Sequence, residues 1–202
     1  MAMVYALEGM TPVIDPTAFV HPTAVLIGDV MIGAGTYVGP HASLRGDFGR
    51  IVVGTGASVQ DGCVMHGYPG ADTVIGDDAS IGHGAVVHSA RIGHRALVGM
   101  NAVVNDNAQV GDDAVIAAMS FIRAGMIVPP RSMVVGIPGR VLRELSDTEL
   151  AWQRQGSRVY QALAQRCLAG LVPATALTAP ESNRARLDWG SVRPLSDMKR
   201  AT

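Results

Sequence analysis

Aromatic residues, charged residues and lysine are scarce in this chain of 202 residues. Aromatic side chains make up 4% of the sequence, charged side chains 16%, and the formal net charge is −1. Because nucleic-acid binding depends on basic patches and on aromatic rings that stack on bases, this composition argues against a nucleic-acid partner. Lys199 is the only lysine, which argues against catalysis by a lysine amine.

Long apolar runs and cysteine are also rare. No apolar run approaches the roughly 18 residues of a membrane-spanning helix, and the chain starts without a basic and apolar signal segment. We therefore expect a cytoplasmic protein that does not bind membranes. Cys63 and Cys167 lie far apart, and two reduced thiols fit an intracellular chain better than a disulfide does. Cys63 occupies the small position of the repeat described next, which predicts a core residue rather than a nucleophile.

The chain is instead rich in a six-residue repeat of aliphatic residues. The first run is Val20, Leu26, Ile32, Val38 and Leu44, and after a slip the pattern continues from Val53 to Val128 around an insertion at 67–73. One unit is a short extended segment and a turn, so three units complete a triangular coil of about 18 residues. The repeat predicts an all-β fold, a parallel β-helix of hexapeptide repeats with about six coils and a narrow aliphatic core.

The sequence predicts three successive parts. The β-helix domain occupies 1–140 and ends in a Gly-Ile-Pro-Gly turn, which should release the chain from the coils. A C-terminal helix packed on the β-helix is expected within 141–170, because Ser146 and Glu149 form a capping-box pattern. Its apolar stripe is Leu150, Val159, Leu163 and either Cys167 or Leu168. From 171 to 202 we expect an irregular or flexible tail.

The coil faces should carry much aliphatic and little charged surface, since 48% of all residues are hydrophobic. Large exposed apolar faces are usually covered by another protein surface, and self-association is the simplest way to cover them. We expect a homotrimer.

Three histidines inside the repeat form a candidate metal site. His66 and His88 each directly follow a core aliphatic residue, so they should lie one coil apart and project side by side. His83 is out of phase with them and should leave the coil in another direction, toward a metal shared with a neighbouring subunit. Three imidazole ligands with one open position are typical of catalytic Zn²⁺, although Fe²⁺ or Co²⁺ would accept the same donors. The alternative is that these histidines merely occupy exposed turns.

Nearby polar residues favour the metal site over exposed turns. Gln60 lies six positions before His66 and is expected to share its corner, which would place the amide near a metal-bound water. Asp61 follows Gln60, and Arg45 and Asp47 lie where the repeat first slips.

Taken together, these residues and spacings resemble the γ-class carbonic anhydrases. The likeness covers residues 5–170 and is strongest to the phenylacetate-degradation and carnitine-operon members. It rests on 24–30, 43–50, 63–67 and 97–101, and extends into 149–152 and 160–167.

The resemblance implies a trimer of left-handed β-helices with a metal, usually zinc, at each subunit interface. It also implies that Arg45 pairs with Asp47 and with a neighbour's Asp61, and that Gln60 orients the zinc-bound hydroxide. An exposed Arg45–Asp47 pair would contribute under about 1 kcal/mol, whereas loss of one partner inside an interface would cost about 3–5 kcal/mol.

Zinc lowers the pKa of bound water to about 7, and the resulting hydroxide could attack carbon dioxide or a thioester carbonyl. The acidic proton shuttle of the family's prototype is not evident, because the insertion at 67–73 carries only Asp72 and Phe48 follows the Arg-Gly-Asp. Regeneration of hydroxide should then be slow, which a slower hydrolase tolerates. We therefore expect a zinc-dependent acyl-CoA thioesterase accessory to phenylacetate (aromatic) degradation.

Three alternatives stay open at this point. The first is a modest γ-type carbonic anhydrase acting on CO2 and bicarbonate. The second is a hexapeptide acyltransferase, which typically uses one histidine as a base in a cleft between subunits. The third is a metal-stabilised scaffold without catalysis.

Overall fold

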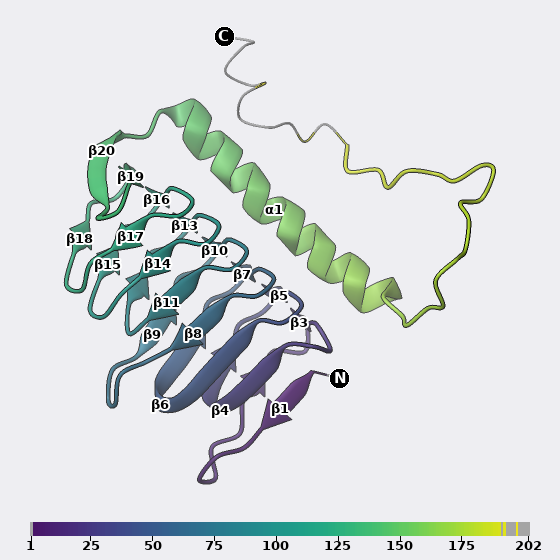
Figure 1. The fold of residues 1–202 in the computed structure, drawn as a ribbon, viewed down its shortest axis with the longest axis horizontal. Coiled ribbons are helices and arrows are strands. Elements are labelled where there is room, and N and C mark those ends of the chain that lie inside the picture. The colour runs from purple at the N-terminus through teal and green to yellow at the C-terminus, as the bar shows by residue number, and fades with distance from the viewer. Residues whose placement is uncertain (1, 191, 193–196, 198–202) are drawn as a thin grey trace.

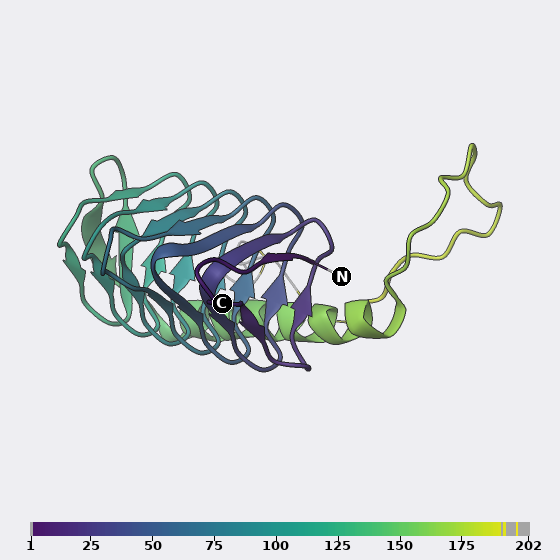
Figure 2. The same cartoon turned by 90° about the horizontal axis from the view of Figure 1, so that it is seen from below.

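The computed structural model describes residues 2–190, 192 and 197. Its body is a parallel β-solenoid of about seven turns, along which one C-terminal helix runs (Figure 1). Viewed from below, the coils stack as closely similar loops with the helix alongside them (Figure 2). The predicted parallel β-helix with a C-terminal helix is confirmed, and its left-handedness and trimeric assembly stay predictions.

Two sheets form the solenoid. The 12-stranded sheet contains β1 (Met3–Tyr5), β2 (Val13–Ile14), β4 (Val25–Ile32), β6 (Ser43–Val53), β8 (Val64–His66), β9 (Thr73–Ile75), β11 (Val86–His88), β12 (Arg91–Ile92), β14 (Val103–Val104), β15 (Gln109–Val110), β17 (Phe121–Ile122) and β18 (Ile127–Val128). The 8-stranded sheet contains β3 (Phe19–Val20), β5 (Tyr37–Val38), β7 (Ser58–Val59), β10 (Ser80–Ile81), β13 (Leu97–Val98), β16 (Val115–Ile116), β19 (Ser132–Val135) and β20 (Arg140–Glu144). Among the described residues, every strand pair is parallel except β19 with β20.

The core consists of aliphatic side chains stacked from coil to coil. Leu26 pairs with Leu44, and Leu44 pairs with Met65, and all three are fully buried. Ile81 pairs with Val98 in the same way on the 8-stranded sheet. The repeat predicts this core because side chains at equivalent positions of successive coils point into the same narrow interior.

The turn at 136–139 ends the parallel coils as predicted, but it leads first into a strand that was not predicted: β20 folds back antiparallel on β19. The helix follows within the predicted range, and α1 spans Asp147–Gly170. The predicted capping box is confirmed: Ser146 accepts from the Glu149 backbone N–H, and the Glu149 carboxylate accepts from the Ser146 backbone N–H.

Helix α1 lies along one corner of the solenoid and contacts it through polar side chains. Gln153 donates to the carbonyl of Arg95, Ser157 to that of Asp78 at 2.9 Å, and Gln161 to that of Gly56 at 3.1 Å. One helical turn advances about 5.4 Å and one coil about 4.8 Å, so successive turns of the helix meet successive coils.

The predicted apolar stripe is therefore wrong in part. Leu150 is buried, and of the two alternatives Cys167 packs while Leu168 is 47% exposed, but Val159 is only partly buried, whereas the polar Gln153 and Ser157 are buried. The reason is that the helix covers a row of turns whose backbone carbonyls need hydrogen-bond donors. Apolar contact occurs at both ends of the helix. Near its start Leu150 packs with Leu97, Val115, Met133 and Leu145, and near its end Leu163 and Cys167 pack with Phe19, Tyr37, Tyr160 and Ala164.

The described part of the tail, from 171 to 190, contains no helix or strand and is almost entirely exposed, in agreement with the predicted irregular segment. Within the portion of the chain that the structure describes, no helix combines the length and apolar character needed to span a bilayer.

Candidate metal centre

His66 and His88 lie side by side on the 12-stranded sheet. Strands β8 and β11 are paired so that the two residues stand directly opposite one another, because the insertion at 67–73 lengthens the intervening coil without shifting the register. Nδ1 of His66 lies 3.3 Å from Nε2 of His88. The predicted proximity of this pair is confirmed.

A carboxylate holds the outer nitrogen of each ring. Nε2 of His66 lies 2.8 Å from an oxygen of Asp47, and Nδ1 of His88 lies 2.5 Å from an oxygen of Asp106. Metal-binding histidines typically donate their second ring N–H to such a carboxylate, which fixes the ring and leaves the other nitrogen free for the metal.

The spacing of the two inner nitrogens fits a tetrahedral ion. Two zinc–nitrogen bonds of about 2.05 Å at the tetrahedral angle leave about 3.3 Å between the nitrogens. The separation between Nδ1 of His66 and Nε2 of His88 is also 3.3 Å. The pair therefore fits two of the ligands of a zinc ion, with Asp47 and Asp106 as outer supports.

His83 lies apart from this pair, as its phase predicts. It follows β10 of the 8-stranded sheet, and its Nδ1 lies 2.7 Å from an oxygen of Asp61, while its Nε2 lies 3.3 Å from the hydroxyl of Tyr160. Its side chain is 45% exposed. Across the described residues, no group of three His, Cys, Asp or Glu side chains is placed to hold a metal ion within one chain.

The other predicted site residues lie either beside the His66–His88 pair or beside His83. Arg45 donates to Asp47 at 2.8 Å, so that Asp47 bridges the guanidinium and His66. Asp61 contacts His83 of its own chain. Within one chain, Asp47 and Asp61 thus support histidines on different corners.

Gln60 is not on the corner of His66. It is buried, its backbone N–H donates to the carbonyl of Ile81, and it precedes Asp61 at the corner that carries His83. Six residues advance the chain by one of the three faces of a coil, so an equivalent position in the repeat is a different corner in space. Within one chain, Gln60 and His66 therefore lie on different corners of the solenoid.

Three contacting residues were not predicted to belong to the site. Asp106 supports His88, Tyr160 contacts His83 from helix α1, and the ring of Phe48 lies 5.1 Å from that of His66. The sequence could have indicated Asp106, because it lies one coil beyond His88, just after β14.

Burial, and secondarily the charge of Asp61, raises the pKa of Tyr160 to about 12, so its hydroxyl stays protonated and can donate to His83.

Cys63 is a core residue, as predicted. It is fully buried, and its thiol donates to the carbonyl of Gly82 at 3.2 Å. Burial raises the pKa of this thiol to about 11, which leaves very little thiolate at neutral pH and argues against a nucleophilic function.

The fold and its repeat define a hexapeptide-repeat β-solenoid protein. Residues 89–124 match the family described as bacterial transferase hexapeptide (six repeats). The carnitine operon protein CaiE of Proteus sp. (strain LE138) is 54% identical over 184 residues, which cover 91% of this chain and 93% of the relative. CaiE of Escherichia coli O157:H7 is 53% identical over 183 residues with the same coverage of 91% and 93%. The chain belongs to the CaiE family of hexapeptide-repeat proteins, which confirms the resemblance inferred from its sequence.

Solved structures agree with this assignment. A proposed acetyltransferase of Bacillus cereus is 30% identical, with a TM-score of 0.82, and the match covers 83% of this chain and 98% of that protein. A hexapeptide transferase family protein from Anaplasma phagocytophilum is 34% identical, with a TM-score of 0.79 and coverage of 81% and 97%.

Proposed function

We propose that the protein is a metal-dependent hydrolase of acyl-CoA thioesters whose centre is shared between the subunits of a homotrimer. The observation that carries this proposal is the pair of inner nitrogens of His66 and His88, 3.3 Å apart, each ring supported by a carboxylate. His83 of a neighbouring chain would complete the ligand set.

Zinc bound there would supply a hydroxide at neutral pH for attack on the thioester carbonyl. The protein residues orient and stabilise this centre. Asp47 and Asp106 fix the two imidazole rings, and Arg45 holds Asp47 in turn. Gln60, on the His83 side of the interface, would orient the attacking water through its amide. An aromatic acyl group, as in phenylacetate degradation, is our preferred substrate.

The proposal is tested by zinc content and thioester hydrolysis in His66→Ala and His83→Ala, with His94→Ala as a matched control. Each of the first two variants should lose metal and turnover, and His94→Ala should keep both. Full turnover in His66→Ala would refute the proposal.

Co-expression of the two inactive variants tests the sharing of the centre. A mixed interface regains all three histidines when His66 comes from one chain and His83 from the other. Random assembly of equal amounts produces this combination at about one quarter of the interfaces, so about a quarter of the wild-type activity should return. No recovery in confirmed mixed trimers would contradict a shared centre.

An acyltransferase is the second candidate. The two solved structures named above favour it, and so does the contact of His83 with Asp61, because a carboxylate-oriented imidazole is a typical general base. Release of coenzyme A that requires an added amine or alcohol acceptor, and that survives removal of metal, would favour this candidate. Stopped-flow hydration of carbon dioxide tests the carbonic anhydrase alternative in the same preparations.

A further inference from the structure

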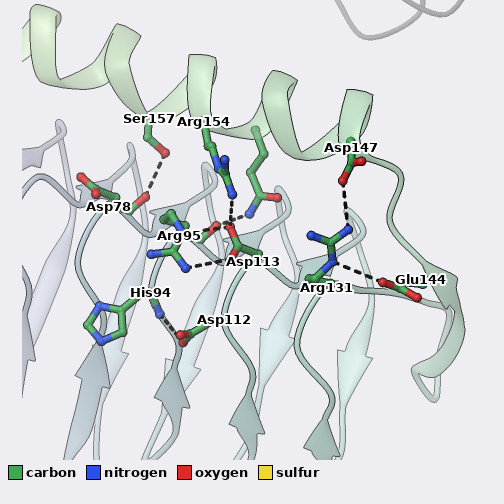
Figure 3. A network of polar contacts seen from close by, with 11 residues as sticks. Asp78, His94, Arg95, Asp112, Asp113, Arg131, Glu144, Asp147, Arg154 and Ser157 are labelled. Atoms are coloured by element: carbon green, nitrogen blue, oxygen red, sulfur yellow. Dashed lines mark hydrogen bonds and ion pairs between the residues drawn. The ribbon is translucent and has the colours of Figure 1, made fainter.

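A small cavity lies between helix α1 and the corner of the solenoid that it covers. Its volume is about 170 Å³, and it is lined by Asp78, Arg95, Arg154, Ser157, Arg158 and Gln161. Figure 3 shows Arg95 on the coil and Arg154 on the helix converging on Asp113, beside the contact of Ser157 with Asp78.

Arginine side chains outnumber carboxylates in the lining of this cavity. Arg95 donates two hydrogen bonds to Asp113, at 2.9 and 2.8 Å, and so uses both oxygens of that carboxylate. Arg154 reaches the same carboxylate only at 3.6 Å, and no ion pair of Arg158 is present among the described residues. Asp78, the one acidic residue in the lining, accepts from the Gln161 amide at 2.7 Å. Three guanidinium groups thus line the cavity beside one lining carboxylate, Asp78, and two of them, those of Arg95 and Arg154, share Asp113.

This arrangement fits a phosphate group. Arginine binds phosphate through paired N–H donors. Such donors are available on Arg158, which has no ion pair among the described residues, and on Arg154, whose contact with Asp113 is long at 3.6 Å. The cavity, at about 170 Å³, has room for a phosphate group but not for a nucleoside as well, so the remainder of the ligand would lie on the exposed surface outside it.

The position of the cavity relative to His83 suggests which phosphate group would bind there. Asp78 and His83 lie five positions apart on the segment that includes β10, so Asp78, in the cavity lining, is within about 17 Å of His83 along the coil. Coenzyme A carries its thioester on a long arm and a phosphate monoester on the ribose at the other end. We propose that Arg95, Arg154 and Arg158 bind the 3′-phosphate of coenzyme A, an inference that rests on an acyl-CoA substrate as proposed above.

The test is calorimetric binding of coenzyme A and of dephospho-coenzyme A, which differ only in this phosphate. The wild type should bind coenzyme A about tenfold more tightly, the usual effect of a charge-assisted contact. Arg158→Gln should remove most of that preference while the protein keeps its melting temperature, because the side chain is exposed. Arg140→Gln, which removes another exposed arginine on β20, should leave the preference unchanged.

Competition by inorganic phosphate is an independent test of the site. Phosphate should compete with coenzyme A for binding but should not compete with dephospho-coenzyme A. Equal affinity of the wild type for the two compounds, or an unchanged preference in Arg158→Gln, would overturn the proposal, as would failure of coenzyme A to bind.

Binding is measured without turnover, so the failure of this proposal is distinguishable from failure of the proposed function. In His66→Ala the preference for the phosphorylated compound should persist. A preserved preference in a wild type that hydrolyses no thioester would support the phosphate site and refute the hydrolase. Normal hydrolysis without the preference would refute the phosphate site alone.

Discussion

Replacement of Asp106 by asparagine tests whether the paired histidines are a metal site. Asp106 contacts Nδ1 of His88 at 2.5 Å, and its function in the proposed site is to hold that ring with Nε2 directed at His66. The substitution keeps the size of the side chain and removes its charge. It should therefore weaken the hold on the His88 ring without opening a cavity.

The expected magnitude follows from the exposure of the pair. Loss of an outer carboxylate typically weakens metal binding by about 10- to 100-fold, or about 1.4–2.7 kcal/mol. The side chains of His88 and Asp106 are 31% and 34% exposed, so water screens part of the interaction. We expect a loss of about tenfold, at the lower end of that range.

The measurement is zinc affinity by competition with a chromophoric chelator. Asp72→Asn is the matched control, because it removes the same charge from the exposed insertion at 67–73. That control should bind zinc as the wild type does. Equal zinc affinity of Asp106→Asn and wild type would show that the carboxylate does not support a metal ligand, and the interpretation of the histidine pair would fail with it.

Three further predictions concern stability and reactivity. Gly156→Ala, within helix α1 with nothing within 4 Å of the added Cβ, should stabilise the protein by up to about 1 kcal/mol in urea unfolding. Gly99→Ala should destabilise it in the same assay, because the added Cβ would collide with the backbone of Ala117 and Ala118. The Cys63 thiol, with its pKa raised to about 11 by burial, should resist alkylation at pH 8 until the protein is unfolded; rapid native labelling would contradict its burial. The hydrogen bond from Arg95 lowers the pKa of Asp113, so Asp113→Asn should destabilise the protein at neutral pH. The difference in unfolding free energy between the variant and the wild type should vanish as the pH falls through the lowered pKa. A difference that persists at lower pH would contradict this account.

The solenoid and the histidine pair were predictable because both depend on counting along the chain. In a β-helix the register between coils is set by the number of residues per coil, so equivalent positions stack. His66 and His88 could be placed together once the insertion between them was recognised, and Cys63 could be placed in the core.

The contacts of the helix and the position of Gln60 were not predictable in the same way. The stripe of Leu150, Val159 and Leu163 assumes that an amphipathic helix packs by its apolar side alone. Leu150 and Leu163 do pack in apolar clusters, but between them α1 lies on turns whose carbonyls accept hydrogen bonds from Gln153 and Ser157. These donors depend on which corner the helix covers, and the helical periodicity does not contain that information.

The same coil geometry also explains why one chain does not complete the candidate site. His66 and His88 are on β8 and β11 of the 12-stranded sheet, whereas His83 follows β10 of the 8-stranded sheet. Side chains that leave different corners of a triangular coil diverge, and the closely packed core prevents the corners from approaching one another. A three-histidine centre in this protein therefore requires a second chain, and metal binding and assembly should stabilise each other by mass action.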